Sequence, residues 1–152
     1  MNYATLTQLT ERYAERDLRN ITDPDAQALN MDRAGQALDD AAAEIDTHLA
    51  VRYVLPLVDA AGNAMSVPLA LVRCACDIAI YRLQTLRASD DIKDARHRYE
   101  DVTRLLRAIA KGEVALPGAQ LRADVAGNLP AQSAGLPKFG QPPSIWSREN
   151  RT

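Results

Sequence analysis

The chain has 152 residues, of which 47% are hydrophobic, 25% charged and only 5% aromatic, and its net formal charge is −2. This composition is typical of one modest globular domain, and the scarcity of aromatic residues favours closely packed helices over a sandwich or barrel. The balanced charge argues against a surface built mainly to bind phosphate groups. The polar N-terminus and the absence of an apolar run near the ~20 residues that cross a bilayer predict a soluble cytoplasmic protein without a membrane partner.

A first helix is expected over residues 6–19. Thr5 and Gln8 have the spacing of a capping box, in which each residue satisfies a backbone N–H near the other. The sequence TDPD at residues 22–25 is typical of a turn followed by the start of another helix.

A second helix is expected over residues 32–50, because apolar residues recur there every three or four positions. Its outward face is acidic, since residues 31–50 contain five Asp and Glu residues and one Arg. The carboxylates that we expect on that face include Asp39, Asp40 and Glu44.

The segment between the second and third helices has a different character. Residues 51–58 are rich in β-branched side chains, and with residues 64–67 they flank the turn-like sequence around Gly62 and Asn63. This pattern predicts a short, irregular hairpin. Pro56 cannot donate a ladder hydrogen bond, so the segment is at best an edge.

A third helix, over residues 68–87, is apolar around most of its circumference and must be covered on several sides. It is therefore either the central helix or a subunit contact. Cys74 and Cys76 point to nearly opposite sides of it, so we expect two small buried side chains and neither a disulfide nor a metal site. Its polar stripe is narrow and comprises Arg73, Asp77, Gln84 and Arg87.

The fourth helix, over residues 92–111, has the clearest limits. Ser89 is a good N-cap, and Gly112 follows Lys111 as a left-handed C-terminal cap would. Six Lys and Arg residues against three Asp and Glu residues make this helix basic, with a net charge of +3. Its outward cations include Arg104, Arg107 and Lys111.

Composition changes near residue 112, and residues 112–152 contain five of the seven glycines and five of the eight prolines. We therefore expect a helical domain over residues 1–116 and an extended Pro/Gly-rich arm over residues 117–152. The arm contains the single Phe and the single Trp of the chain, and aromatic and Arg residues are typical of anchoring segments. The candidate anchoring residues are Phe139, Pro142, Pro143, Ile145, Trp146, Arg148 and Arg151.

Reactive constellations are absent from the sequence. It has no glycine-rich phosphate loop, no nucleophile elbow and no zinc-protease motif. His48 lies four residues after Glu44, which favours a simple pair along one helix, and His97 is expected to be solvated. We predict that the protein is not an enzyme and holds no cofactor or metal.

The charge pattern suggests how copies of the chain could associate. If the acidic face of Asp39, Asp40 and Glu44 and the basic face of Arg104, Arg107 and Lys111 lie on opposite sides, copies attract head to tail. Such a contact closes into a ring when the rotation between subunits divides the circle. The alternative is that both faces are independently solvated.

Five stretches together resemble the Mu-like prophage head–tail adaptor proteins: YATLTQLTERY at 3–13, the ITD turn at 21–23, ALDDAAAEIDTHLAVRYVLPL at 37–57, VPLALVRCACDIAIYRL at 67–83 and RYEDVTRLLRAIAKGEVAL at 98–116. None contains a catalytic signature, and it is their order and spacing that are specific. The arm after residue 117 has no pattern of this family.

The resemblance implies an all-α fold: a small bundle of about four helices with a β-like loop between the second and third helices and an extended C-terminal tail. It also implies a non-enzymatic virion protein of the phage neck, assembled in the host cytoplasm. Such a protein forms a twelve-fold ring under the portal protein, extends a channel whose content is DNA, and docks the tail or a tail-terminator or stopper protein.

In such a ring, the loop between the second and third helices would contact a neighbouring subunit or the tail through Arg52, Tyr53, Leu55, Gly62 and Asn63. The alternative is a simple crossover loop with Tyr53 and Leu55 in the core. The arm would bind the portal. A different function remains open as well, because a small DNA-binding protein of packaging or regulation could use the basic helix 92–111.

Overall fold

The computed structural model describes residues 1–23, 25, 28–85 and 92–127. Within these residues the chain is almost entirely helix, turn and loop, which confirms the predicted all-α bundle. Its helices are α1 (Leu6–Arg12), α2 (Glu15–Thr22), α3 (Met31–Leu49), α4 (Leu69–Thr85), α5 (Ile92–Lys111) and the short α6 (Ala123–Ala126).

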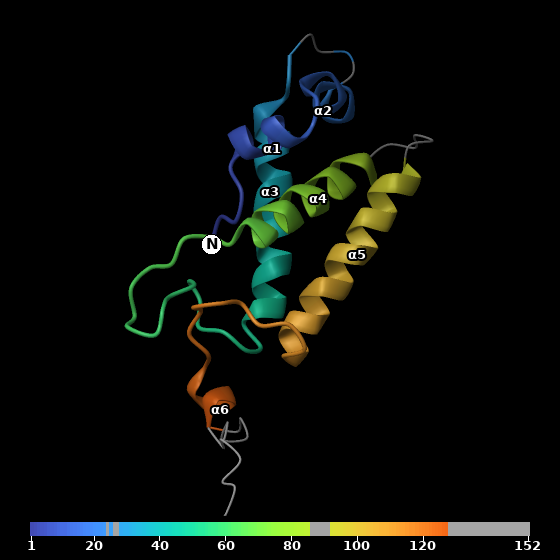
Figure 1. Cartoon of the computed structure of the whole chain (residues 1–152). Coiled ribbons are helices and arrows are strands. Elements are labelled where there is room, and N and C mark those ends of the chain that lie inside the picture. Colours follow the sequence, from blue (N-terminus) through green and yellow to red (C-terminus); the bar gives the residue numbers. More distant parts are fainter. Residues whose placement is uncertain (24, 26–27, 86–91, 128–152) are drawn as a thin grey trace, which may run out of the picture.

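Helix α4 is the centre of the bundle. It packs extensively against α3 and α5 and makes smaller contacts with α1 and α2, and Figure 1 shows it crossing between α3 and α5. Nine of its residues are buried, including both cysteines. Of the two roles left open for this apolar helix, the structure supports the central one.

The prediction of a single helix over residues 6–19 is wrong, because α1 ends at Arg12 and α2 begins at Glu15. Between them, Tyr13 has extended backbone angles of φ −124° and ψ 139°. Its hydroxyl group donates a hydrogen bond to Asp77 on α4. Neither Gly nor Pro occurs at the break, so a tertiary contact ends α1 where helix propensity alone would continue it.

The predicted N-terminal cap of α1 and the predicted C-terminal cap of α5 are confirmed. Thr5 and Gln8 form the capping box of α1. At the end of α5, Gly112 has φ +82°, its N–H donates to Ile109 O at 3.0 Å, and Glu113 N–H donates to Ala108 O at 2.9 Å. These two bonds are the Schellman pattern that satisfies the last carbonyls of a helix.

The predicted irregular hairpin is present as isolated bridges without regular strands. Val58 pairs with Ala64. The carboxylate of Asp59 accepts hydrogen bonds of 2.9 Å from the backbone N–H groups of Ala61 and Asn63, and these bonds lower the pKa of the Asp59 carboxyl group. Gly62 has φ +84°, which glycine adopts at no steric cost.

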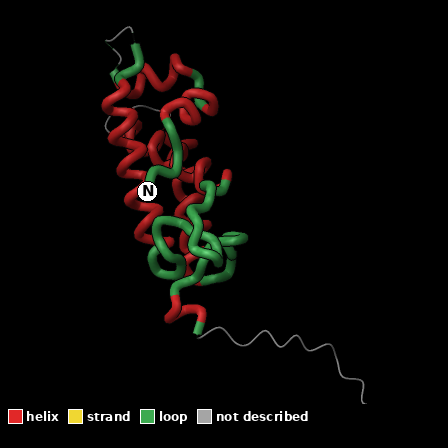
Figure 2. Tube along the Cα trace, turned by 90° about the vertical axis from the view of Figure 1, so that its left-hand side faces the viewer, coloured by secondary structure: helices red, strands yellow, loops and turns green. Residues whose placement is uncertain are grey.

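The chain after α5 returns to this hairpin. Tyr53 pairs with Leu121, and backbone hydrogen bonds join Gln120 to Val54 and Val58 and join Arg122 to Arg52. Figure 2 shows these loops gathered at one end of the helices. Within the described residues, no helix is both long enough and apolar enough to span a bilayer.

Candidate functional site

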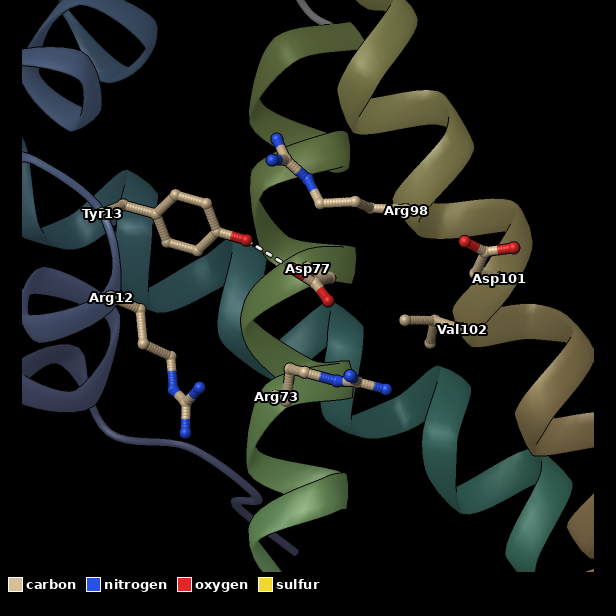
Figure 3. Close-up of a pocket in the computed structure, with 7 residues that line it drawn as sticks. All are labelled: Arg12, Tyr13, Arg73, Asp77, Arg98, Asp101 and Val102. Carbon is tan, nitrogen blue, oxygen red and sulfur yellow. Dashed lines mark hydrogen bonds between the residues drawn. The ribbon is translucent and has the colours of Figure 1, made fainter.

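A charged pocket of about 450 Å³ opens between α1, α4 and α5. Figure 3 shows arginines from all three helices around a central tyrosine–aspartate pair. Because these helices are far apart in sequence, only the packed bundle brings the side chains together. The lining residues are Arg12, Tyr13, Arg73, Asp77, Arg98, Asp101 and Val102.

Tyr13 organises the floor of this pocket. Its hydroxyl group donates to Asp77, and the guanidinium carbon of Arg98 lies 5.7 Å from the centre of its ring, within the range of a cation–π contact. Burial, and then the hydrogen bond to Asp77, raise the pKa of the Tyr13 hydroxyl group. Tyr13 therefore acts as a neutral donor that holds Asp77 while its ring face positions Arg98.

The pocket is lined by three arginines and only two aspartates, and neither aspartate is paired with one of these arginines. Asp77 accepts from Tyr13, and Asp101 pairs with Arg104 at 2.9 Å. Among the described residues, Arg12, Arg73 and Arg98 have neither a hydrogen bond nor an ion pair. An arginine binds carboxylate or phosphate oxygens through paired N–H groups, so the pocket can hold an anionic group.

Within the described part of the chain, no cluster of three or more His, Cys, Asp or Glu side chains could hold a metal ion. The carboxylate of Asp77, at the centre of the pocket, already accepts a hydrogen bond from the Tyr13 hydroxyl group. No histidine lines the pocket. The three arginines of the lining favour binding of an anionic group.

On the acidic face of α3, Asp39 and Asp40 are exposed as predicted. Glu44 is not part of this face. Its side chain is 15% exposed, it pairs with Arg82 at 2.9 Å and it accepts a hydrogen bond of 2.7 Å from the Tyr99 hydroxyl group.

These two partners occupy both carboxylate oxygens of Glu44. The expected pairing of Glu44 with His48 is therefore wrong, and so is the placement of Glu44 among the outward charges. His97 is 75% exposed, which confirms that it is solvated.

The basic residues of α5 line a second pocket of about 590 Å³ on the outer side of that helix. Arg104 pairs with Asp101 at 2.9 Å, and Lys111 lies 3.9 Å from Glu113. Arg107 has no such partner among the described residues. The predicted basic face is present, but two of its three named cations are already close to carboxylates.

The loop residues separate into two groups. Gly62 and Asn63 are exposed at the tip of the hairpin, where a partner could reach them. Tyr53 is only 2% exposed, and its hydroxyl oxygen accepts a hydrogen bond from Leu116 N–H. Leu55 packs partly buried against the core, so these two side chains follow the crossover-loop alternative.

Arg52 lies between these groups. Its backbone carbonyl accepts a hydrogen bond from Arg122 N–H, and its guanidinium group lies beside Gly112, where it occupies the space that a Cβ atom would take. A cation at this place is favourable, because the carbonyl end of α5 carries partial negative charge. Arg52 therefore has a structural role at the end of α5.

The candidate anchoring residues of the arm, Phe139, Pro142, Pro143, Ile145, Trp146, Arg148 and Arg151, lie outside the described residues, as does the expected N-cap Ser89.

The arginine pocket was not predicted from the sequence. One indication of it was present, because Arg73 and Asp77 lie four residues apart on the narrow polar stripe of α4. The partners of this polar stripe, Tyr13 and Arg98, come from distant segments whose packing the sequence pattern does not reveal.

Comparison with known proteins gives a consistent result. The profile of the family described as Bacteriophage Mu, Gp36 matches residues 3–133. The Mu-like prophage FluMu protein gp36 of Haemophilus influenzae is 40% identical over 115 residues, which cover 75% of this chain and 74% of that protein. Gene product J of Escherichia phage Mu is 31% identical over 153 residues, which cover 99% of this chain and 98% of that protein.

Proposed function

The chain belongs to the Bacteriophage Mu, Gp36 family and is thus a phage protein, and from this premise we propose that it is the structural head–tail connector, or adaptor, of a tailed phage. In this role it forms a ring under the portal protein, extends the DNA channel and docks the tail. Its place is the neck of the virion.

The observation that carries this proposal is the resemblance of residues 3–116 to the Mu-like prophage head–tail adaptors, together with membership in a phage family over residues 3–133. The geometry is in keeping with it. The exposed surface carries an arginine pocket and an acidic helix face, both suited to binding other macromolecules.

We propose that the ring has twelve copies, to match the portal, and that residues 117–152 attach it there. Anchors repeated around a ring multiply weak contacts through effective concentration. The exposed hairpin tip at Gly62 and Asn63 then belongs to the surface that meets a neighbouring subunit, or the tail and its terminator or stopper protein.

The direct test is imaging of the purified full-length chain with portal particles of the same phage by negative-stain electron microscopy. The expected result is a ring of added density on the tail-facing side of the portal, absent from particles incubated with buffer. Portal particles that stay bare at a saturating concentration of the chain would contradict the proposal.

A second candidate function rests on the basic outer pocket of α5, which could contact DNA through Arg104, Arg107 and Lys111. Phosphate contacts release counterions, so this function requires DNA affinity that falls steeply with salt. A fluorescence titration with duplex DNA at several salt concentrations separates the two functions. A channel protein gives at most a shallow, nonspecific dependence, whereas a DNA-binding protein gives a slope of several ions per site.

A further inference from the structure

The arginine pocket and the acidic face of α3 point in opposite directions. Arg73 and Asp77, which line the pocket, lie on the side of α4 away from α3, and Figure 3 shows α3 behind α4 with the pocket in front. On α3, Asp39 and Asp40 are exposed, while Leu38 and Ala41 on either side of them are buried against the bundle. The acidic face is therefore turned away from the pocket of its own chain.

Both faces have charge that their own chain leaves unmatched. Arg12, Arg73 and Arg98 have no ion-pair partner among the described residues, although the two carboxylates of the pocket are occupied by Tyr13 and Arg104. Asp39 and Asp40 likewise form no ion pair within the described part of the chain, although Asp40 lies close enough to Arg82 to contribute to the raised pKa of that guanidinium group. Complementary charges that cannot meet within one molecule can meet between two.

We propose that the arginine pocket of one copy binds Asp39 and Asp40 of a second copy of this chain. The contact is heterologous, because different surfaces of the two copies meet, and repetition of it produces a ring or a filament. This inference deepens the proposed function and rests on it for the closure of the ring. The subunit contact thus uses Arg12, Arg73 and Arg98 in place of the Arg104, Arg107 and Lys111 face expected from the sequence.

The pocket suits this occupant better than the outer pocket of α5 does. Two cations of the α5 pocket already lie close to Asp101 and Glu113, whereas the three arginines of the pocket between α1, α4 and α5 are unpaired. Arg98 is also positioned over the Tyr13 ring, which reduces the side-chain entropy lost when it binds a carboxylate. Exposed ion pairs are screened by salt, so the contact should weaken as ionic strength rises.

Two charge-reversal variants test the contact. The pocket variant carries Arg73→Glu and Arg98→Glu, and the face variant carries Asp39→Arg and Asp40→Arg. Sedimentation velocity at low ionic strength measures self-association of each full-length protein. We expect wild type to associate and each variant alone to associate at least ten-fold more weakly, because like charges then meet at every contact.

An equimolar mixture of the two variants is the decisive sample. When copies of the two variants alternate, the arginine pocket of the face variant meets Asp39 and Asp40 of the pocket variant, and the Glu pocket of the pocket variant meets the Arg face of the face variant. Opposite charges then meet at every contact, so association should return to near the wild-type level. The matched control carries Arg107→Glu and Lys111→Glu on the outer pocket of α5, leaves the pairing of Arg104 with Asp101 intact and should associate like wild type. Far-UV circular dichroism checks that every variant is folded. If the reversed charges prevent folding, Arg73→Gln with Arg98→Gln replaces the pocket variant in the single-variant measurement only, because a neutral pocket cannot restore association with the reversed face.

Three outcomes would overturn the contact: a wild type that stays monomeric at low ionic strength, a mixture that does not associate, or loss of association in the α5 control alone. These results are distinct from failure of the connector proposal. Association through this contact without any binding to portal particles would reject the connector role and leave the contact standing. Portal-bound rings whose assembly is unaffected by both charge reversals would reject the contact and leave the connector role standing.

Discussion

The hydroxyl oxygen of Tyr53 accepts a hydrogen bond of 2.9 Å from the backbone N–H of Leu116, 63 residues further along the chain. This bond joins the segment after α3 to the segment after α5. Tyr53 is 2% exposed and Leu116 is 7% exposed, so water cannot easily replace either partner. The loop end of the bundle is therefore closed by a buried polar contact as well as by apolar packing.

Replacement of Tyr53 by Phe should lower the free energy of unfolding by about 1–3 kcal/mol, because the buried Leu116 N–H loses its acceptor. Urea denaturation followed by circular dichroism measures the change. Tyr81→Phe is the control, since the Tyr81 ring stacks on Tyr99 at 4.3 Å between centroids and the substitution keeps the ring. Equal stabilities of Tyr53→Phe and wild type would contradict the role of this bond.

Gly112→Ala should destabilise the protein by about 1–2 kcal/mol, the steric cost of a left-handed conformation for a residue with a Cβ atom. The new Cβ would also displace the Arg52 guanidinium group from beside the end of α5. Gly35→Ala is the matched control, because nothing lies within 4 Å of a Cβ atom at that position on α3. Thermal denaturation should show Gly35→Ala to be neutral or stabilising, and a parallel loss in both variants would argue against the cap.

Stability should fall as pH rises from about 9 to 11. Burial raises the pKa of the Cys74 and Cys76 thiols from 9.0 to about 11, so over this range the unfolded chain has released protons that the folded chain retains. The unfolded state then binds fewer protons, and the free energy of unfolding decreases with pH. Burial also raises the pKa of the hydroxyl groups of Tyr3 and Tyr13, which acts in the same direction.

Urea denaturation at pH 8, 9, 10 and 11 measures this dependence. A double variant, Cys74→Ala with Cys76→Ala, is less stable throughout because of the small cavities, but its stability should fall less steeply with pH. Equal slopes for the variant and wild type would assign the alkaline loss to other groups.

Two truncations separate the folded domain from the proposed portal anchor. A chain that ends at residue 127 keeps the hydrogen bonds of Gln120 and Arg122 to the 52–58 segment and should be as stable as wild type while failing to bind portal particles. A chain that ends at residue 116 loses those bonds and should be less stable by about 1–3 kcal/mol. Co-sedimentation with portal particles and thermal denaturation measure the two properties, and full binding by the chain ending at 127 would remove the arm from the portal site.

Trp146→Ala should weaken attachment to the portal by more than ~1 kcal/mol, as truncation of an aromatic anchor at an interface does. Ile145→Ala is a milder companion variant with a smaller expected loss. Titration of labelled portal particles measures the affinity, and an unchanged dissociation constant for Trp146→Ala would exclude it from the site.

Local sequence determined much of this molecule. The apolar spacing of α3 and α5, the capping box of Thr5 and Gln8, the left-handed Gly112 and the hairpin turn at Gly62 could all be predicted, because each depends on residues within a few positions of one another. The all-α class and the resemblance to a phage family were likewise readable from the order of these segments along the chain.

Only the tertiary structure decided where distant polar groups meet. The break after Arg12, the internal pairing of Glu44 and the burial of Tyr53 each depend on a partner more than 35 residues away along the chain. The arginine pocket has the same origin, since its side chains come from α1, α4 and α5. Helical periodicity shows which side of a helix is polar, but the packing of one helix against another determines whether that side meets solvent, its own chain or another molecule.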